Sequence, residues 1–74
     1  MEINIEHILL FKTTIRTEAD KRFIASVMEA RQIEQWTVDL QDIDCVLRIV
    51  SPTLQTTEVI AFISENGYLC EVLT

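Results

Sequence analysis

Apolar and polar positions in the first half of the chain predict a strand followed by a helix. The segment HILLFKT (7–13) is short, apolar and free of Gly and Pro, which is typical of a strand buried on both faces. The preceding MEINIE (1–6) alternates apolar and polar residues, so this strand could begin earlier. Thr17, three positions before Asp20, predicts a helix start of the capping-box kind. The helix is expected over about 18–31, and its inward face is expected to be Phe23, Ile24, Val27 and Met28.

The middle of the chain predicts two paired strands. WTVDL (36–40) alternates apolar and polar residues and indicates a half-buried strand. QDID (41–44) has the length of a hairpin turn, and CVLRIVS (45–51) is the expected returning strand. Pro52 should end that strand, because it has no N–H to donate to a neighbouring strand.

The last quarter of the chain predicts a second helix and a final strand. The helix is expected within 55–67, with Thr56 or Thr57 near its cap. It should end at Asn66-Gly67, since Gly accepts the left-handed conformation that closes a helix. The residues expected to face inward are Val59, Ile60, Phe62 and Ile63. YLCEVLT (68–74) is the expected last strand.

This order of elements predicts a single domain over residues 1–74 with an α+β, ferredoxin-like βαββαβ fold. The fold is a two-layer sandwich, in which a four-stranded antiparallel sheet carries both helices on one face. The first and third strands are expected in the centre of the sheet. Cys45 and Cys70 would then lie about two strand spacings apart, roughly 9–10 Å, which is too far for a disulfide. Both are expected to be buried free thiols.

Composition narrows the possible partners and the compartment. The formal charge of −6 and the pI of about 4.5 disfavour nucleic acid and anionic membrane surfaces, since both repel an acidic protein. No apolar run approaches the roughly 18 residues of a membrane span. The start of the chain lacks a basic segment followed by an apolar one, so a cytoplasmic location is expected.

The second half of the chain resembles a known family. The stretches IEQWTVDLQDIDCVLRIV and VIAFISENGYLCEVL resemble the heavy-metal-associated domain of small copper chaperones and of copper-transporting ATPases. That family reads Val-x-x-Val-x-Val-Asp-Leu on its second strand and ends its last helix in Ala-Gly-Tyr. The residues that fall on these positions are Ile33, Trp36, Val38, Asp39, Leu40, Gly67 and Tyr68.

The chain lacks the Met-x-Cys-x-x-Cys motif with which this family binds metal. The two cysteines would fall near Arg16 and Ala19, and the methionine near Thr14. Copper(I) prefers soft thiolate ligands, which these residues cannot supply, so no copper(I) site, no other metal site and no cofactor is expected. The resemblance further implies that Tyr68 packs under the former metal loop, against residues 13–16.

Charge is distributed unevenly along the chain. Residues 12–22 carry a net charge of +2 and the remaining residues −8. The basic residues of this segment are Lys12, Arg16, Lys21 and Arg22. They coincide with the expected amino end of the first helix, where free N–H groups and the helix dipole favour an anion. We therefore predict that the segment binds an acidic surface of a partner protein or a small anion, with Arg16 in the centre.

Alternation divides the strand residues between the two faces of the expected sheet. Toward the helices it places Leu9, Phe11, Cys45, Leu47, Ile49, Cys70 and Val72. The opposite face, here called the open face, should hold Lys12, Arg48 and Glu71 and six aliphatic residues: Ile8, Leu10, Val46, Val50, Leu69 and Leu73. So many aliphatic side chains predict association of the open face, foremost with a second copy in a homodimer. The alternative is burial of this face by MEINIE.

Catalysis is not indicated by the sequence. The one histidine, His7, stands apart from any nucleophile, and no Gly-rich loop for phosphate is present. We therefore expect a small non-catalytic binding protein that acts through protein–protein association. Two alternatives stay open. The first is a metal-binding or heavy-metal transport protein with a non-standard site, for which Asp39, Asp42 and Asp44 offer hard ligands. The second is a regulatory small-molecule domain of the ACT type, although 12–17 contains no Gly for a ligand to approach.

Overall fold

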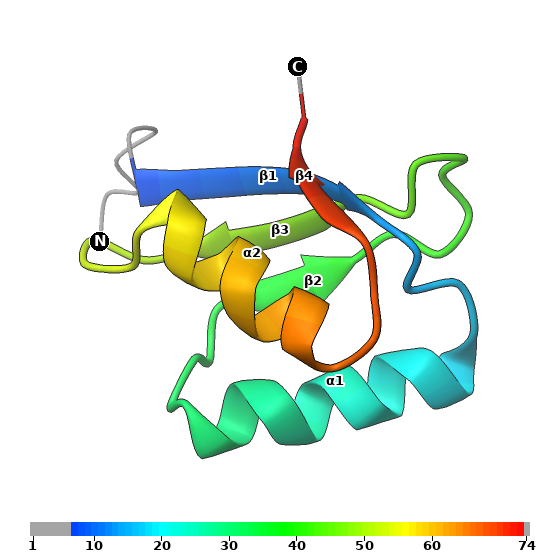
Figure 1. The fold of residues 1–74 in the computed structure, drawn as a ribbon, viewed down its shortest axis with the longest axis horizontal. Helices are drawn as coiled ribbons and strands as arrows, with labels where there is room; N and C mark the ends of the chain where they lie inside the picture. Colours follow the sequence, from blue (N-terminus) through cyan, green and yellow to red (C-terminus); the bar gives the residue numbers. More distant parts are fainter. Residues whose placement is uncertain (1–6, 74) are drawn as a thin grey trace.

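Residues 7–73 are described in a computed structural model, in which they form two layers (Figure 1). One layer is a four-stranded sheet, and the other is a pair of helices on a single face of that sheet. In chain order the elements are β1 (Ile8–Thr13), α1 (Glu18–Ala30), β2 (Trp36–Val38), β3 (Leu47–Val50), α2 (Thr56–Glu65) and β4 (Cys70–Val72). The predicted α+β, ferredoxin-like sandwich is confirmed.

The strands lie in the order β2-β3-β1-β4, so the first and third strands are central as predicted. Every neighbouring pair is antiparallel. β1 pairs with β3 through Ile8–Val50 and Leu10–Arg48, and with β4 through Lys12–Glu71. Cross-strand partners share a face, so this register decides which side chains reach the helices and which belong to the open face.

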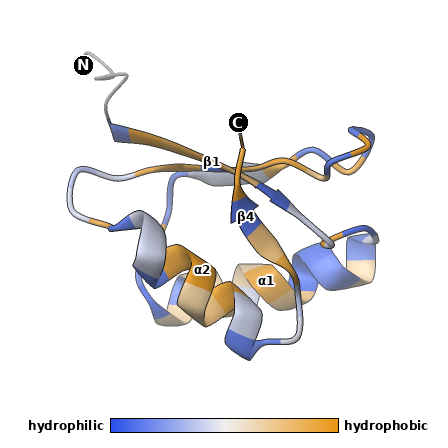
Figure 2. Cartoon of the chain, turned by 45° about the horizontal axis from the view of Figure 1, so that its top comes forward, coloured by the Kyte–Doolittle hydropathy of each residue, from blue (hydrophilic) through white to orange (hydrophobic). Residues whose placement is uncertain are grey.

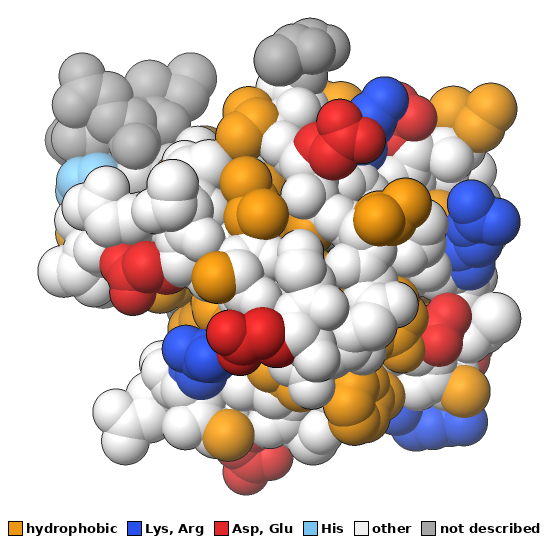
Figure 3. Space-filling view, in the orientation of Figure 1, with side chains coloured by type: hydrophobic (Ala, Val, Ile, Leu, Met, Phe, Trp, Pro, Cys, Tyr) orange, Lys and Arg blue, Asp and Glu red, His pale blue; other side chains and the backbone are white. Residues whose placement is uncertain are grey.

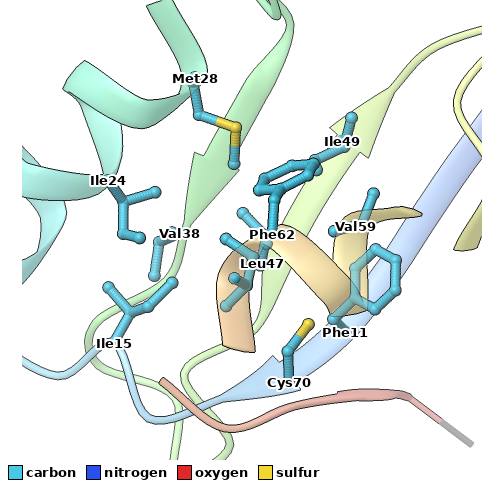
Figure 4. Close-up of a cluster of buried hydrophobic side chains, with 11 residues drawn as sticks. Phe11, Ile15, Ile24, Met28, Val38, Leu47, Ile49, Val59, Phe62 and Cys70 are labelled. Atoms are coloured by element: carbon cyan, nitrogen blue, oxygen red, sulfur yellow. The ribbon is translucent and has the colours of Figure 1, made fainter. Parts of the chain in front are cut away.

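Side chains from both layers meet in one core (Figure 4). The central strands contribute Phe11, Leu47 and Ile49, and the β1–α1 connection adds Ile15, all of them buried. From the helices come Ile24, Met28, Val59, Phe62 and Ile63. Hydrophobic residues accordingly run along β1 and through α2 in Figure 2. This burial of apolar surface is the main force that holds the helices on the sheet.

The inward face of α1 is narrower than predicted. Ile24 and Met28 are buried and Val27 is half-buried, but the Phe23 side chain is 46% exposed. Its ring lies 6.3 Å from that of Tyr68 instead of under the sheet. Phe23 therefore packs at the margin of the two layers, and its assignment to the core was wrong.

The second helix begins and ends close to the predicted positions. Thr56 is its first residue, while the N-cap itself is Gln55, whose N–H donates to the Glu58 carboxylate at 3.0 Å. At the other end Gly67 has a φ of +91°, and the N–H of Tyr68 donates to the carbonyl of Ile63. The left-handed residue thus turns the chain back into β4 as predicted.

The hairpin between β2 and β3 differs from its prediction. Residues 39–46 connect the two strands, in place of a four-residue turn over 41–44. The carboxylates of Asp39 and Asp42 accept hydrogen bonds from the N–H groups of Gln41 and Asp44, and Cys45 has a φ of 45°. Aspartate side chains that bind nearby N–H groups favour turns over strand pairing, which explains the longer connection.

The outer parts of the predicted strands also fall outside the sheet. β4 covers Cys70–Val72 and not 68–74, and the possible earlier start of β1 in MEINIE lies outside the described residues. Val72 pairs with Phe11, so it shares the helix side as predicted. It is nevertheless 46% exposed, because β4 is an edge strand.

Both cysteines are buried and free, as predicted. In the part of the chain that the structure describes, neither helix has the length and apolar character that a membrane crossing requires.

Candidate functional site

Hydrogen bonds tie the β1–α1 connection to two segments beside it, the β2–β3 connection and the residue before β4. The hydroxyl of Thr13 donates to the carbonyl of Cys45 at 2.8 Å and accepts from the N–H of Ile15 at 3.1 Å. On the other side, Thr14 and Leu69 exchange two hydrogen bonds: the Thr14 N–H donates to the Leu69 carbonyl, and the Leu69 N–H donates to the Thr14 hydroxyl. The connection therefore has a defined shape without any metal ligand.

At the amino end of α1, two side chains accept hydrogen bonds from three backbone N–H groups. The Thr17 hydroxyl accepts from the Asp20 N–H at 3.0 Å, and the Asp20 carboxylate accepts from the N–H groups of Arg16 and Thr17 at 3.2 Å each. The hydroxyl of Tyr68 donates to the other oxygen of Asp20 at 2.9 Å. This is the capping box that the sequence predicts, with a tyrosine added from the β4 side.

These contacts change the acidity of both partners. The hydrogen bond from Tyr68, followed by those at Arg16 and Thr17, holds the pKa of Asp20 below its ordinary value. Burial and the nearby carboxylate raise the pKa of Tyr68. The Asp20 carboxylate is thus an anion of the chain itself at the helix start, bound to the N–H groups of Arg16 and Thr17, and the small-anion prediction stays a prediction.

Lys12 and Arg16 are brought together with residues from two distant segments. They line a shallow hollow of about 160 Å³ at the end of the sheet. Thr13 and Thr14 also line it, as do Ile43 and Asp44 from the β2–β3 connection, Glu71 from β4 and Leu69 just before β4. We call its six charged and aliphatic residues the loop-end surface: Lys12, Arg16, Ile43, Asp44, Leu69 and Glu71. It combines two cations, two carboxylates and two aliphatic side chains.

The aliphatic residues are the unusual part of the loop-end surface. Ile43 is 96% exposed and Leu69 is 69% exposed, the two most exposed large hydrophobic side chains of the described residues. Single exposed aliphatic side chains are common on protein surfaces, but two of them that line the same hollow beside charged groups have the composition of a protein–protein interface.

The predicted basic segment does not form one continuous patch. Lys12 and Arg16 belong to the loop-end surface, whereas Lys21 and Arg22 lie on α1 and do not line that hollow. Arg22 is exposed and Lys21 is half-buried. In Figure 3 most blue spheres stand along the margin that carries the β1–α1 connection, separated by red and orange spheres.

Tyr68 contacts the first turns of α1, whereas the sequence predicted contacts with residues 13–16. Its hydroxyl bonds to Asp20 and its ring lies beside Phe23, so it secures the first turns of α1. Its packing against residues 13–16 stays a prediction. Backbone contacts of its neighbour Leu69 hold that connection in place.

The register supports the predicted composition of the open face. Ile8 lies opposite Val50, Leu10 opposite Arg48 and Lys12 opposite Glu71. Leu10 is 40% exposed, while the other four aliphatic side chains apart from Leu69 are half-buried: Ile8, Val46, Val50 and Leu73. Lys12, Leu69 and Glu71 belong to both surfaces, so the open face runs directly into the loop-end surface.

Sequence reasoning missed Ile43 and Asp44 as members of this site. The expected four-residue turn placed both at a solvated hairpin tip. The signal was present in QDIDC, where an isoleucine stands among carboxylates. Only the longer connection, together with the hydrogen bond from the Thr13 N–H to the Asp44 carbonyl at 2.9 Å, brings this segment to the end of β1.

The sequence leaves open a metal site at this junction or in the hairpin, and the placement of the candidate ligands bears on it. Arg16 and Ala19, where the family's cysteines would stand, are exposed. Among residues 7–73, no group of three or more His, Cys, Asp or Glu side chains is arranged to hold a metal, and this includes His7 and the three aspartates of the hairpin. Burial, aided by the charge of Glu71, raises the pKa of the Cys70 thiol to about 11, which keeps it protonated at neutral pH.

The family resemblance rests on the sequence alone. Its positions Val38 and Leu40 lie toward the core and Gly67 closes α2, and these are roles that many sandwiches of this kind require. Comparisons with known protein families, with curated proteins and with solved structures found no match for this chain.

Proposed function

We propose that this chain is a small non-catalytic binding protein that acts through protein–protein association, with the loop-end surface as its docking site. The observation that carries the proposal is the exposure of Ile43 and Leu69 beside Lys12 and Arg16. Covering two aliphatic side chains supplies binding energy, and the flanking charges orient the partner.

The alternatives from the sequence find less support. A small-molecule regulatory domain needs a concave and largely apolar pocket, whereas the hollow at this junction holds about 160 Å³ and is lined by four charged residues. A non-standard metal site lacks a suitable ligand group among the described residues.

Comparative capture from a cell extract tests the proposal. Wild type, Arg16→Glu and Ile43→Asp are immobilised, and retained proteins are quantified by mass spectrometry. Both substituted side chains are exposed, so the fold should be unaffected. We expect a set of proteins that wild type retains and that both variants lose by about tenfold, which corresponds to about 1.4 kcal/mol.

Arg22→Glu on α1 is the matched control. It makes the same charge change at an exposed site outside the loop-end surface. It should retain the same proteins as wild type. Equal loss in all three variants would show that overall charge, and not this surface, governs capture.

A second candidate assigns the open face to self-association. The observation in its favour is the apolar row that Ile8, Val50 and the exposed Leu10 form across the central strands. Sedimentation velocity at high micromolar concentration tests it, and a single monomeric species would contradict it.

A further inference from the structure

The sheet is incomplete beside the first residues of β1. The register of β4 against β1 covers only residues 11–13 of β1. The Leu73 N–H donates to the Leu10 carbonyl and extends this pairing by one residue. β1 itself begins earlier, at Ile8. Among residues 7–73, no strand therefore lies beside Ile8 on the β4 side of β1.

The backbone groups of Ile8 face this gap. Along a strand, the N–H and C=O groups of successive residues point alternately to its two sides. The Leu10 carbonyl points to the β4 side, because it accepts from Leu73. The His7 carbonyl points to the β3 side, because it accepts from Ser51. Ile8 lies two residues before Leu10, so its N–H and C=O also point to the β4 side, and an edge of this kind can pair with a further extended segment.

The hydrophobic core is also unfinished at this edge. Leu9 and Val72 face the helix side of the sheet, yet Leu9 is only half-buried and Val72 is 46% exposed. Phe11, the next residue of β1 on that side, is by contrast 1% exposed. A hollow of about 270 Å³ lies here, lined by residues 8–11 of β1, Thr56 of α2, Val72 and Leu73. We call it the edge groove, and an aliphatic side chain placed in it would bury apolar surface.

The segment MEINIE (1–6) joins the described structure next to the edge groove. It is followed by His7 and then by Ile8, which lines the groove. His7 lies in a 3₁₀ turn and not in β1, and short 3₁₀ turns commonly connect two segments. Six extended residues span about 20 Å, roughly four strand spacings, so the segment is long enough to enter the groove after a turn. Its apolar residues Met1, Ile3 and Ile5 alternate with polar ones, as in a strand with one face toward a core.

We infer that MEINIE folds back at His7 and fills the edge groove, with Ile3 and Ile5 toward Leu9 and Val72 and its backbone beside Ile8. This inference concerns the end of the sheet opposite the loop-end surface, so it goes beyond the proposed function. One segment would cover the two exposed side chains of the helix side and pair with the open backbone groups of β1. It also assigns MEINIE to the edge of the sheet, whereas the sequence raised the open face as its place.

A separate chain is a poorer occupant of the edge groove. A second copy or a foreign peptide loses translational and rotational freedom when it binds, and stable interfaces between proteins offset this loss with a contact area of about 800 Å² per partner. A hollow of about 270 Å³ is too small for such a contact. MEINIE is linked to Ile8 through a single residue, which gives it a high effective concentration at the groove.

Methyl NMR and hydrogen exchange of the full chain test the inference. With ¹³C-labelled Ile, Leu and Val methyl groups, we expect nuclear Overhauser effects from Ile3 and Ile5 to Leu9 and Val72. The Ile8 amide should exchange slowly, because an N–H that is hydrogen-bonded within a sheet exchanges only when the pairing opens.

Two variants remove the contact from opposite sides. The double variant Ile3→Ser with Ile5→Ser should accelerate exchange at Ile8 by at least about tenfold, since the segment loses the apolar side chains that hold it in the groove. Val72→Lys, at an exposed position, should accelerate it as well by placing a charge in the groove.

Glu2→Gln with Asn4→Ser is the matched control, because it changes the alternate positions of the same segment. Exchange at Ile8 should then stay as in wild type. In every variant, unchanged slow exchange at Leu47 on the central strand β3 verifies that the sheet is folded.

Three results would overturn the inference. Nuclear Overhauser effects from Ile3 and Ile5 to Leu10 and Val50 would assign MEINIE to the open face. Fast exchange at Ile8 in wild type would show that the segment does not pair with β1. Slow exchange at Ile8 that disappears on dilution would assign the edge groove to a second copy.

Discussion

Hydrogen bonds of single residues hold the start of α1 against the segment before β4. Asp20 receives hydrogen bonds from the Arg16 and Thr17 backbone and from the Tyr68 hydroxyl, so one carboxylate joins the helix start to the segment before β4. At the far end of α2, Gly67 adopts a φ of +91° that lets the chain return toward this junction. Substitution of Asp20 or of Gly67 should therefore change the free energy of unfolding.

Asp20→Asn should lower the stability of the fold in a pH-dependent way. The folded state holds the pKa of Asp20 below its value in the unfolded chain, about 3.9. Its stabilising contribution is therefore complete above that unfolded value and is lost as the pH falls through the lower folded pKa. In urea unfolding, the gap between wild type and Asp20→Asn should be widest near neutral pH and shrink below about pH 4.

Glu18→Gln is the control for Asp20→Asn, because Glu18 lies in the same first turn of α1. Its gap to wild type should be smaller at every pH. A gap for Asp20→Asn that stays constant down to strongly acidic pH would contradict the role of the Asp20 carboxylate.

Gly67→Ala should destabilise the fold by about 1–2 kcal/mol, the usual cost of a left-handed conformation for a residue with a Cβ. No atom lies within 4 Å of the position of the added Cβ, so the cost comes from the backbone and not from a clash. The free energy of unfolding in urea measures it. Glu65→Ala, in the last turn of α2, should stay within about 0.5 kcal/mol of wild type, and an equal effect of both substitutions would refute this explanation.

At the scale of elements, the end of β1 is the point at which three segments meet. Thr13 pairs with Cys70 of β4 in register, and its hydroxyl and N–H bond to residues 45 and 44 of the β2–β3 connection. The long hairpin connection is thus held against β1, and the residue before β4 is held against the β1–α1 connection. These bonds place Ile43 and Leu69 at one end of the sheet.

Thr13→Val keeps the shape of the side chain and removes its hydroxyl. It leaves the Cys45 carbonyl and the Ile15 N–H without their partner in a buried position, which should cost about 1–3 kcal/mol of unfolding free energy. Hydrogen exchange should also rise at Ile15. The exposed Thr37→Val on β2 is the control and should change stability little; similar losses in both would point to a general effect of valine.

For the molecule as a whole, an acidic chain concentrates exposed aliphatic side chains and half of its basic residues along the open face and the loop-end surface. On the other face of the sheet, the two helices pack against the strands and bury the hydrophobic core. The docking surface that we propose combines apolar side chains with flanking charges, a mixture that protein interfaces also show.

The wild-type chain should not bind copper(I) tightly, since its two thiols are buried and burial raises the pKa of the Cys70 thiol to about 11. Competition with a chromogenic copper(I) chelator measures this. The double variant Arg16→Cys with Ala19→Cys supplies an exposed Cys-x-x-Cys pair at the junction and should bind one copper(I). Tight loading of wild type would contradict the loss of the site, and failure of the double variant would argue against the family resemblance.

The sequence by itself determined the order of elements, the central strands, the cap at Thr17 and the stop at Gly67, because these depend on local periodicity and on backbone preferences of single residues. It did not determine the length of the β2–β3 connection, the exposure of Phe23, or the meeting of Ile43 with Lys12, Arg16 and Leu69. The exposure of Phe23 and the meeting of Ile43 with the junction arise from contacts between residues far apart in the chain, which local periodicity does not encode. The longer connection follows from local hydrogen bonds of Asp39 and Asp42, which a pattern of apolar and polar positions does not show. Tertiary structure also decided that the Tyr68 hydroxyl, from 48 residues away, donates to the Asp20 carboxylate of this local cap.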